Sequence, residues 1–175
     1  AKLTITFPLS IGQIPIYYSH FNTGRPAISD DNHTYNSSYN DLSIFPKYAF
    51  GYGLSYTTFQ YSNLQLSKKR MNSSEQIEVS VTISNTGKYD GEEIVQLYLR
   101  DKVGSIARPV KDLKDFMKIH LNAGETKTIK FTIDKEKFSF YNQNIQWIAE
   151  PGEFELMIGA SSADIRLTDS FELVN

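Results

Sequence analysis

The chain has 175 residues, of which 40% are hydrophobic and 22% charged, with a formal net charge of −2 at pH 7. This length accommodates one well-buried domain of about 100 to 150 residues and an additional segment. The weak net charge gives no electrostatic basis for binding nucleic acid or an anionic membrane. No apolar run approaches the roughly 20 residues of a membrane span. Cysteine is absent, which excludes disulfides, thiolate catalysis and cysteine-based metal sites.

The first 50 residues differ in pattern from the rest of the chain. Leu3, Ile5 and Phe7 alternate with polar residues, which predicts one strand with a single apolar face. The stretch 22–40 is rich in Asn, Ser, Asp and Gly and is expected to form an irregular loop. One strand and a long loop cannot make a core. We therefore expect this segment to pack against the rest of the chain or to pair with a second copy of it.

From residue 56 onward the sequence consists of short segments in which apolar and polar residues alternate. The alternation is clearest at 76–84 and is typical of strands with one buried face. The candidate strands are 59–66, 76–84, 92–100, 116–121, 126–133, 138–141, 145–148, 153–159 and 170–174, with one helical turn at 135–137. The pattern predicts an all-β, antiparallel β-sandwich of seven or eight strands. Gly124 and Gly152 are expected at turns that need positive φ, and the single Trp147 is expected in the core.

Between these two parts, glycines alternate with aromatic residues over 50–59. Gly51 and Gly53 permit a positive φ or a close approach of two backbones. The neighbouring aromatic rings carry enough apolar area to join two structural units. We therefore expect the junction between the N-terminal segment and the sandwich to consist of Phe50, Gly51, Tyr52, Gly53, Leu54 and Tyr56.

Several short motifs follow one another along the chain: Ile11-Gly12-Gln13-Ile14-Pro15, Asn22-Thr23-Gly24-Arg25-Pro26, Asn85-Thr86-Gly87, Glu150-Pro151-Gly152-Glu153-Phe154 and Gly159-Ala160-Ser161-Ser162. Together with the junction run, this ordered set resembles the C-terminal part of a family 3 glycoside hydrolase of the β-glucosidase kind. The resemblance implies that residues 1–50 are the incomplete tail of an upstream α/β-sandwich catalytic domain. It also implies that residues 51–175 are an immunoglobulin-like sandwich of the fibronectin type III-like kind, preceded by an extended N-terminal segment.

The resemblance further implies a parent enzyme that removes terminal sugars with retention, a β-glucosidase or β-xylosidase. In that family the nucleophile is an Asp of the first, barrel domain, and the acid/base is usually a Glu of the α/β-sandwich domain. Neither is expected here, so the region is expected to be an inactive scaffold. Its implied partners are the upstream catalytic domains of the same chain and a second copy in a homodimer, and the parent's substrate is a glycoside or oligosaccharide. The parent's location is unknown, with the periplasm or secretion favoured.

The remaining polar residues suggest no catalytic or metal site. Ser29-Asp30-Asp31 is superficially similar to the nucleophile motif of the resembled family but lacks its Trp, and we interpret Asp30 as a solvated loop carboxylate. His20, His33 and His120 do not have the spacing of a zinc site. No metal or cofactor is expected.

Two other function classes remain open, a stand-alone carbohydrate-binding module and an immunoglobulin-like interaction domain. The high aromatic content suits the first, because sugars stack on exposed rings. However, Phe59, Phe131, Phe154 and Phe171 occupy inward positions of their strands, which favours a core role. Five tyrosines are harder to place and are expected at an interface with missing domains or in a sugar-facing loop: Tyr17, Tyr18, Tyr35, Tyr39 and Tyr48.

Overall fold

A computed structural model of the chain describes residues 1–27, 29, 30 and 36–175. Its strands are β1 (Phe59–Leu66), β2 (Arg70–Met71), β3 (Ile77–Asn85), β4 (Gly91–Asp101), β5 (Asp112–Leu121), β6 (Thr126–Ile133), β7 (Phe140–Tyr141), β8 (Trp147–Ile148), β9 (Gly152–Gly159) and β10 (Ile165–Leu173). Two short 3₁₀ helices, η1 (Ile11–Gln13) and η2 (Lys135–Lys137), accompany them. Tyr35 and His33 lie outside the described residues.

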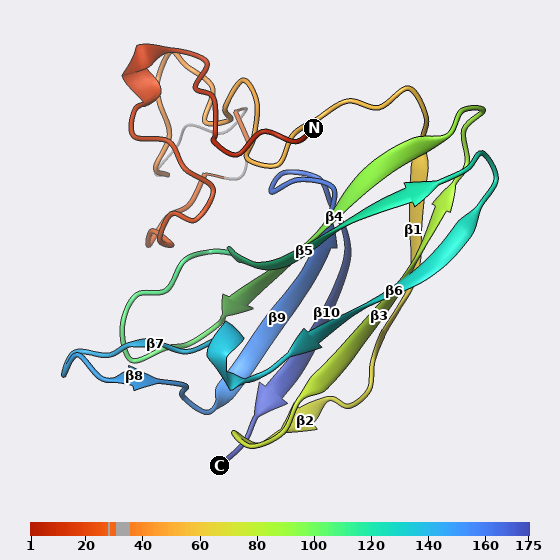
Figure 1. Cartoon of the computed structure of the whole chain (residues 1–175). Helices are drawn as coiled ribbons and strands as arrows, with labels where there is room; N and C mark the ends of the chain where they lie inside the picture. Colours follow the sequence, from red (N-terminus) through yellow and green to blue (C-terminus); the bar gives the residue numbers. More distant parts are fainter. Residues whose placement is uncertain (28, 31–35) are drawn as a thin grey trace.

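The strands confirm the predicted sandwich. In the described part of the chain, β1, β3 and β6 form one sheet in the order β1-β3-β6, and a second sheet has the order β2-β10-β9-β4-β5. The two sheets face each other in Figure 1. All neighbours in them are antiparallel except β10 and β2. Some bounds differ from the prediction. Strand β2 was not expected, β5 and β10 begin earlier than predicted, at Asp112 and Ile165, and β7 and β8 are shorter than predicted.

The core lies between these sheets and follows the alternation of the strands. Ile77, Val79, Val81 and Ile83 of β3 are all buried. Their paired residues on β6 are apolar except at Ile83, and the apolar partners are Ile133, Phe131 and Ile129. The inward phenylalanines predicted from the sequence are buried as well. Among the described residues, the apolar core takes its members only from residue 59 onward. The N-terminal segment therefore contributes nothing to that core.

The prediction that Trp147 packs in the core is wrong. Strands β7 and β8 form a separate hairpin, which projects at the lower left of Figure 1. Phe140 pairs with Ile148 and Tyr141 with Trp147, so the two pairs point to opposite faces. Phe140 is buried, whereas Trp147 is 47% exposed. The indole is exposed because only one face of this small sheet packs on the sandwich.

The expectation of a positive φ holds at one of the two turn glycines. Gly124 has φ +78° in the turn between β5 and β6, which confirms the prediction there. Gly152 is not among the positive-φ residues of the described chain. It is the first residue of β9, and an extended strand residue has negative φ. The prediction for Gly152 is therefore wrong.

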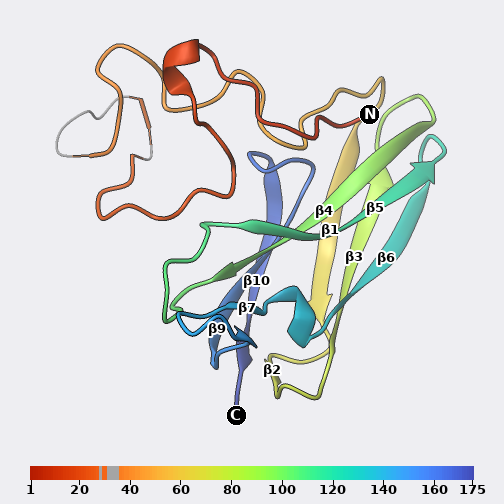
Figure 2. The same cartoon turned by 60° about the vertical axis from the view of Figure 1, so that its left-hand side comes forward.

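The N-terminal segment lies over one end of the sandwich, as Figure 2 shows, and is mostly irregular. The strand predicted at its start does not form. Leu3 exchanges backbone hydrogen bonds with residues 51 and 52, its N–H donating to Tyr52 O at 2.8 Å, and Phe7 pairs with Tyr48 in an isolated bridge. Leu3 is half-buried, but Ile5 and Phe7 are exposed. A strand needs backbone hydrogen bonds to a partner along its whole length. Here the start of the chain makes such bonds to residues 48–52 only at Leu3 and Phe7.

Candidate functional site at the junction of the segment and the sandwich

Gln96 of β4 is the polar centre of the junction. Its neighbours Val95 and Leu97 belong to the core, so Gln96 points to the opposite face of the sheet, where it is nevertheless buried. Its Nε2 donates to Ala160 O at 2.7 Å and to Gly51 O at 3.4 Å. The hydroxyl of Tyr98 donates to its Oε1 at 2.5 Å. One carboxamide thus joins β4, the junction run and the β9–β10 loop, and its saturated hydrogen bonding fixes their arrangement.

Gly51 is required beside Gln96 for two independent reasons. Its φ of +79° lies in the left-handed region that L side chains rarely adopt. A Cβ at this position would also collide with the carboxamide of Gln96. The expectation that Gly51 provides positive φ or a close approach therefore applies here in both senses.

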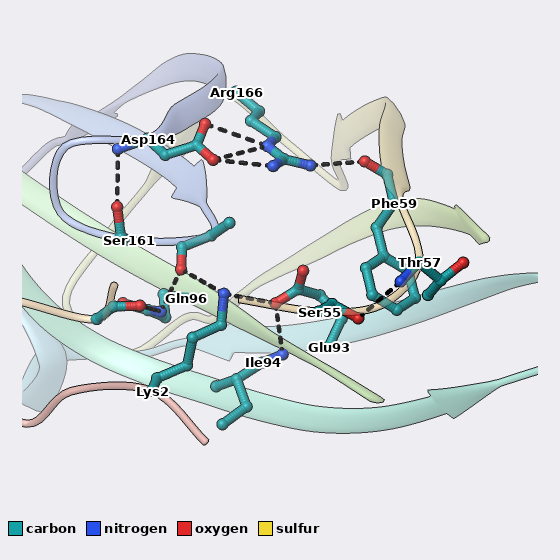
Figure 3. Close-up of polar contacts among 12 residues, drawn as sticks. Lys2, Ser55, Thr57, Phe59, Glu93, Ile94, Gln96, Ser161, Asp164 and Arg166 are labelled. Atoms are coloured by element: carbon teal, nitrogen blue, oxygen red, sulfur yellow. Dashed lines mark hydrogen bonds and ion pairs between the residues drawn. The ribbon is translucent and has the colours of Figure 1, made fainter. Parts of the chain in front are cut away.

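A buried ion pair ties the start of the chain to the sandwich. Lys2 Nζ lies 2.9 Å from Glu93 Oε1, with 17% and 6% of the two side chains exposed. Lys2 Nζ also donates to Ala160 O at 3.1 Å, the carbonyl that Gln96 binds, as Figure 3 shows. Glu93, Val95 and Leu97 are spaced two residues apart on β4, so the side chain of Glu93 lies on the core side of the strand. A carboxylate there needs a cation, because an unpaired buried charge is costly.

The β9–β10 loop that carries Ala160 is itself held firmly. Asp164 N–H donates to Ser161 Oγ at 3.0 Å, and Arg166 Nη2 donates to Asp164 Oδ2 at 2.8 Å. Arg166 Nη1 also donates to Phe59 O at 2.6 Å, so the loop is anchored to the start of β1 (Figure 3). Ser162 N–H then donates to Phe50 O at 2.9 Å. The loop consequently presents fixed backbone groups to the junction.

Aromatic packing completes the contact. The ring of Tyr18 stacks on Phe50 with centroids 4.4 Å apart and meets the edge of Tyr98 at 5.8 Å. The Tyr18 hydroxyl accepts a hydrogen bond from Leu113 N–H at 3.3 Å. Burial raises the pKa of Tyr18 above its ordinary value, so this hydroxyl stays protonated at neutral pH. Tyr18 and Phe50 together join the segment to the five-stranded sheet.

Of the other residues expected at the junction, some make contacts there and some are exposed to solvent. Tyr52 is half-buried and stacks on Tyr48 at 5.1 Å. Gly53 lies so close to Ala1 that a Cβ would be 2.7 Å from Ala1 O. Leu54 is exposed and Tyr56 is 96% exposed. The structure thus brings Phe50 to Gly53 against the segment and the sandwich, and it leaves Leu54 and Tyr56 facing outward.

Sequence reasoning missed the three polar residues that matter most, Lys2, Glu93 and Gln96. A signal existed for Glu93, because it occupies an inward position of a strand whose other inward residues are aliphatic. Gln96 carried no such signal, since a polar residue on the outer face of a strand is ordinary. Lys2 lies 91 positions before Glu93 in the numbering, and nothing in the sequence connects them.

Within the segment, a second buried carboxamide performs the same role as Gln96. Gln13 is buried at the end of η1. Its Oε1 accepts from Leu9 N–H at 2.5 Å, and its Nε2 donates to Ser43 O at 2.7 Å and Phe45 O at 3.0 Å. Gln13 therefore joins the part of the segment around residue 9 to the part around residues 43–45. The segment has a defined shape without an apolar core of its own.

A cavity of about 560 Å³ lies between the segment and the sandwich. Three of the tyrosines that the sequence left unplaced, Tyr17, Tyr18 and Tyr39, line it, together with Lys111 and Ser162 of the sandwich. Lys111 Nζ donates to Ser162 O at 2.8 Å, and burial lowers the pKa of Lys111. Tyr48 lies elsewhere, against Phe7 and Tyr52. The N-terminal segment and the sandwich thus both line this cavity.

Those residues considered for catalysis or metal binding that the structure describes, Asp30, His20 and His120, do not form a common site. Asp30 Oδ1 accepts a hydrogen bond from Ile44 N–H at 2.8 Å, which makes it a structural group of its loop. Within residues 1–27, 29, 30 and 36–175, no three His, Cys, Asp or Glu side chains group so that they could hold a metal ion. The same part of the chain contains no helix of the length and apolar character that crossing a membrane requires.

Comparisons with known proteins agree with this architecture. Residues 93–162 match the fibronectin type III-like domain family. The chain is 49% identical to a periplasmic β-glucosidase of Salmonella typhimurium and 44% identical to a putative β-xylosidase of Formosa agariphila, covering 99% and 98% of this chain but only 22% and 21% of theirs. A crystal structure of a β-glucosidase from Listeria innocua in complex with glucose superposes with a TM-score of 0.93 at 42% identity, covering 99% of this chain and 24% of that one.

Fold, junction and domain match define a fibronectin type III-like sandwich with a docked N-terminal segment. The chain spans about a fifth of the length of the relatives it matches. Over nearly its whole length the chain is similar to a part of longer β-glucosidases, in agreement with the resemblance to family 3 glycoside hydrolases seen in the sequence.

Proposed function

We propose that this region is the non-catalytic support of a retaining, exo-acting β-glycosidase, a β-glucosidase or β-xylosidase. In this proposal residues 1–50 are the tail of an upstream α/β-sandwich catalytic domain, and residues 51–175 are the supporting domain. The region covers apolar surface of the catalytic domains and fixes their orientation. Such support matters because displacements of about 1 Å in a reacting group can cost on the order of 100-fold in rate.

The observation that carries the proposal is the apolar character of the segment's outer surface. Exposed aliphatic and aromatic side chains gather on the segment and the junction run, namely Ile5, Phe7, Leu9, Ile11, Ile14, Tyr17, Phe21, Phe45 and Leu54. Exposed apolar side chains concentrated in one segment of a chain favour an interaction site there. The relatives have roughly four fifths of their length outside the matched region, which supports the remainder of the same protein as the covering partner.

The rigid junction explains how covering such a surface would affect catalysis. The Lys2–Glu93 ion pair and the Gln96 carboxamide fix the segment on the sandwich. Whatever binds the outer surface of the segment is therefore held in a defined orientation relative to the sandwich. A flexible linker would not transmit orientation in this way.

The test uses residues that are exposed here and would be buried in the longer protein. Ile11→Asp and Leu54→Asp should leave the melting temperature of the 175-residue chain unchanged, because both side chains are solvent-exposed in it. In the longer glycosidase the same changes should lower the melting temperature. They should also reduce kcat/KM for hydrolysis of an aryl β-glucoside by up to about 100-fold. Val103→Asp is the matched control, since Val103 is an exposed aliphatic residue on the β4–β5 connection.

The proposal fails if Ile11→Asp and Leu54→Asp behave like Val103→Asp in the longer enzyme. A second copy of the chain is the rival partner for this surface. Sedimentation of the 175-residue chain separates the two, because self-association that Ile11→Asp abolishes would identify a homodimer contact on this surface.

A further inference from the structure

The β7–β8 hairpin carries a partly exposed aromatic pair on its outer face. Tyr141 and Trp147 are directly opposite each other across the two strands. Their ring centroids are 5.0 Å apart with an interplanar angle of 55°. They are 59% and 47% exposed. The opposite face of the hairpin is anchored, because Phe140 is buried with the Arg108 guanidinium 4.1 Å from its ring centroid.

The orientation of the indole is fixed although the ring faces solvent. Trp147 Nε1 donates to Glu136 Oε2 at 2.8 Å, and Glu136 belongs to η2 on the body of the sandwich. The hairpin turn is likewise ordered, since Asn142 Oδ1 accepts from Asn144 N–H at 2.9 Å and from Gln146 N–H at 3.0 Å. A prepositioned exposed ring reduces the entropy that a ligand must overcome on binding.

Most of the residues beside the rings carry amide side chains. The turn that joins the two aromatic residues contains four amide residues, Asn142, Gln143, Asn144 and Gln146, and one apolar residue, Ile145. The side chains of Gln143, Asn144 and Ile145 are exposed. Carboxamides both donate and accept hydrogen bonds. Aromatic faces flanked by such groups fit a pyranose ring of the β-gluco type, whose equatorial hydroxyls point outward and whose axial C–H groups form apolar faces.

The size of the surface favours a sugar over a protein. Partly exposed Tyr and Trp rings offer together about 200 Å², whereas a stable protein interface needs about 800 Å² from each partner. Two rings match one or two sugar units. We propose that Tyr141 and Trp147 form a surface site for neutral β-linked gluco-oligosaccharides. This site is independent of the role proposed above, because it lies on the hairpin and does not involve the segment or the junction.

The single Trp of the chain makes the test specific. Titration of the 175-residue chain with cellotetraose should shift the Trp147 emission saturably, with half-saturation on the order of 1 mM. Tyr141→Ala should weaken binding by about 5-fold, the loss expected for one aromatic contact. Tyr141→Phe should preserve it. Tyr89→Ala removes an exposed tyrosine of the β3–β4 turn and should have no effect.

Calorimetry provides a measurement that does not depend on the fluorophore. Trp147→Ala should abolish the heat of cellotetraose binding while circular dichroism confirms that the sandwich is folded. Sorbitol, a polyol without a ring, should give no saturable signal. The proposal is overturned by a non-saturating response to cellotetraose, by an equal response to sorbitol, or by unchanged affinity in Tyr141→Ala or Trp147→Ala.

Discussion

Lys2 and Glu93 form an ion pair at 2.9 Å between the second residue of the chain and the core side of a central strand. The side chain of Glu93 is almost completely buried, and Lys2 is the cation that approaches it within ion-pair distance in the described chain. Arg166, the other nearby cation, is bound to Asp164 and to Phe59 O. The sandwich therefore depends on the N-terminal segment for charge compensation. This dependence makes the segment part of the folded unit although it contributes nothing to the apolar core.

Loss of the lysine charge should destabilise the sandwich itself. Lys2→Met leaves a buried carboxylate without its nearest partner and should lower the free energy of unfolding by about 3 kcal/mol, the lower end of the range for such a loss because Lys2 is partly exposed. Adding Glu93→Gln should recover much of this loss, because the unpaired charge is then gone. Chemical denaturation of the single and double variants measures both effects. Lys130→Met breaks the exposed pair with Glu78 and should change little; equal losses for Lys2→Met and Lys130→Met would show that the buried pair is unimportant.

Gly51 is expected to tolerate no side chain. Gly51→Ala combines an unfavourable φ, at about 1 to 2 kcal/mol, with displacement of the buried Gln96 amide, at about 1 to 3 kcal/mol. Gly124→Ala is the matched control, since Gly124 has nearly the same φ but open space where the new methyl group would lie. Thermal unfolding should therefore show a distinctly larger loss for Gly51→Ala. Equal losses would mean that the Gln96 contact carries no stability.

The sequence predicted Gly51 as a special position because glycine between aromatic residues implies a backbone requirement. It could not identify Gln96 as the group that Gly51 approaches. The residues at the junction come from the first residues of the chain, the middle of β4 and the β9–β10 loop. Contacts this distant in sequence are set by the packing of the two sheets, and no local pattern reports them. The strands themselves were predictable because alternation is a local property.

The prediction for Trp147 failed for a different reason, because it relied on residue type and placed an exposed side chain in the core. A large apolar side chain in an alternating segment suggests a core position. The alternation of Phe140 with Tyr141 and of Trp147 with Ile148 shows only that one of the two cross-strand pairs can face the sandwich. Which pair faces inward depends on the path of the chain after η2, and this is a tertiary property.

Truncation of core side chains should test the inward face of the sandwich. Leu97→Ala creates a cavity beside β9 and should cost about 2 to 5 kcal/mol, with a melting temperature lower by roughly 5 to 15 °C. Val81→Ala should act in the same direction with a smaller loss, because it removes fewer atoms. Thr82→Ala removes one methyl group and a hydroxyl that pairs with Thr128 on the outer face of the sheet, and it should have little effect. Comparable losses at Val81 and Thr82 in differential scanning calorimetry would contradict the assignment of the buried face.

The 175-residue chain should have no glycosidase activity of its own. Retention requires two carboxyl groups about 5 to 5.5 Å apart, one as nucleophile and one as acid/base, and the family resemblance places both in the upstream domains. Asp30, the carboxylate with a superficial likeness to the nucleophile motif, is engaged with the backbone of Ile44. Aryl β-glucosides and β-xylosides at high protein concentration should therefore give only the background rate. Turnover that persists through purification and disappears in Asp30→Asn would show that this loop is catalytic and that the region is an enzyme by itself.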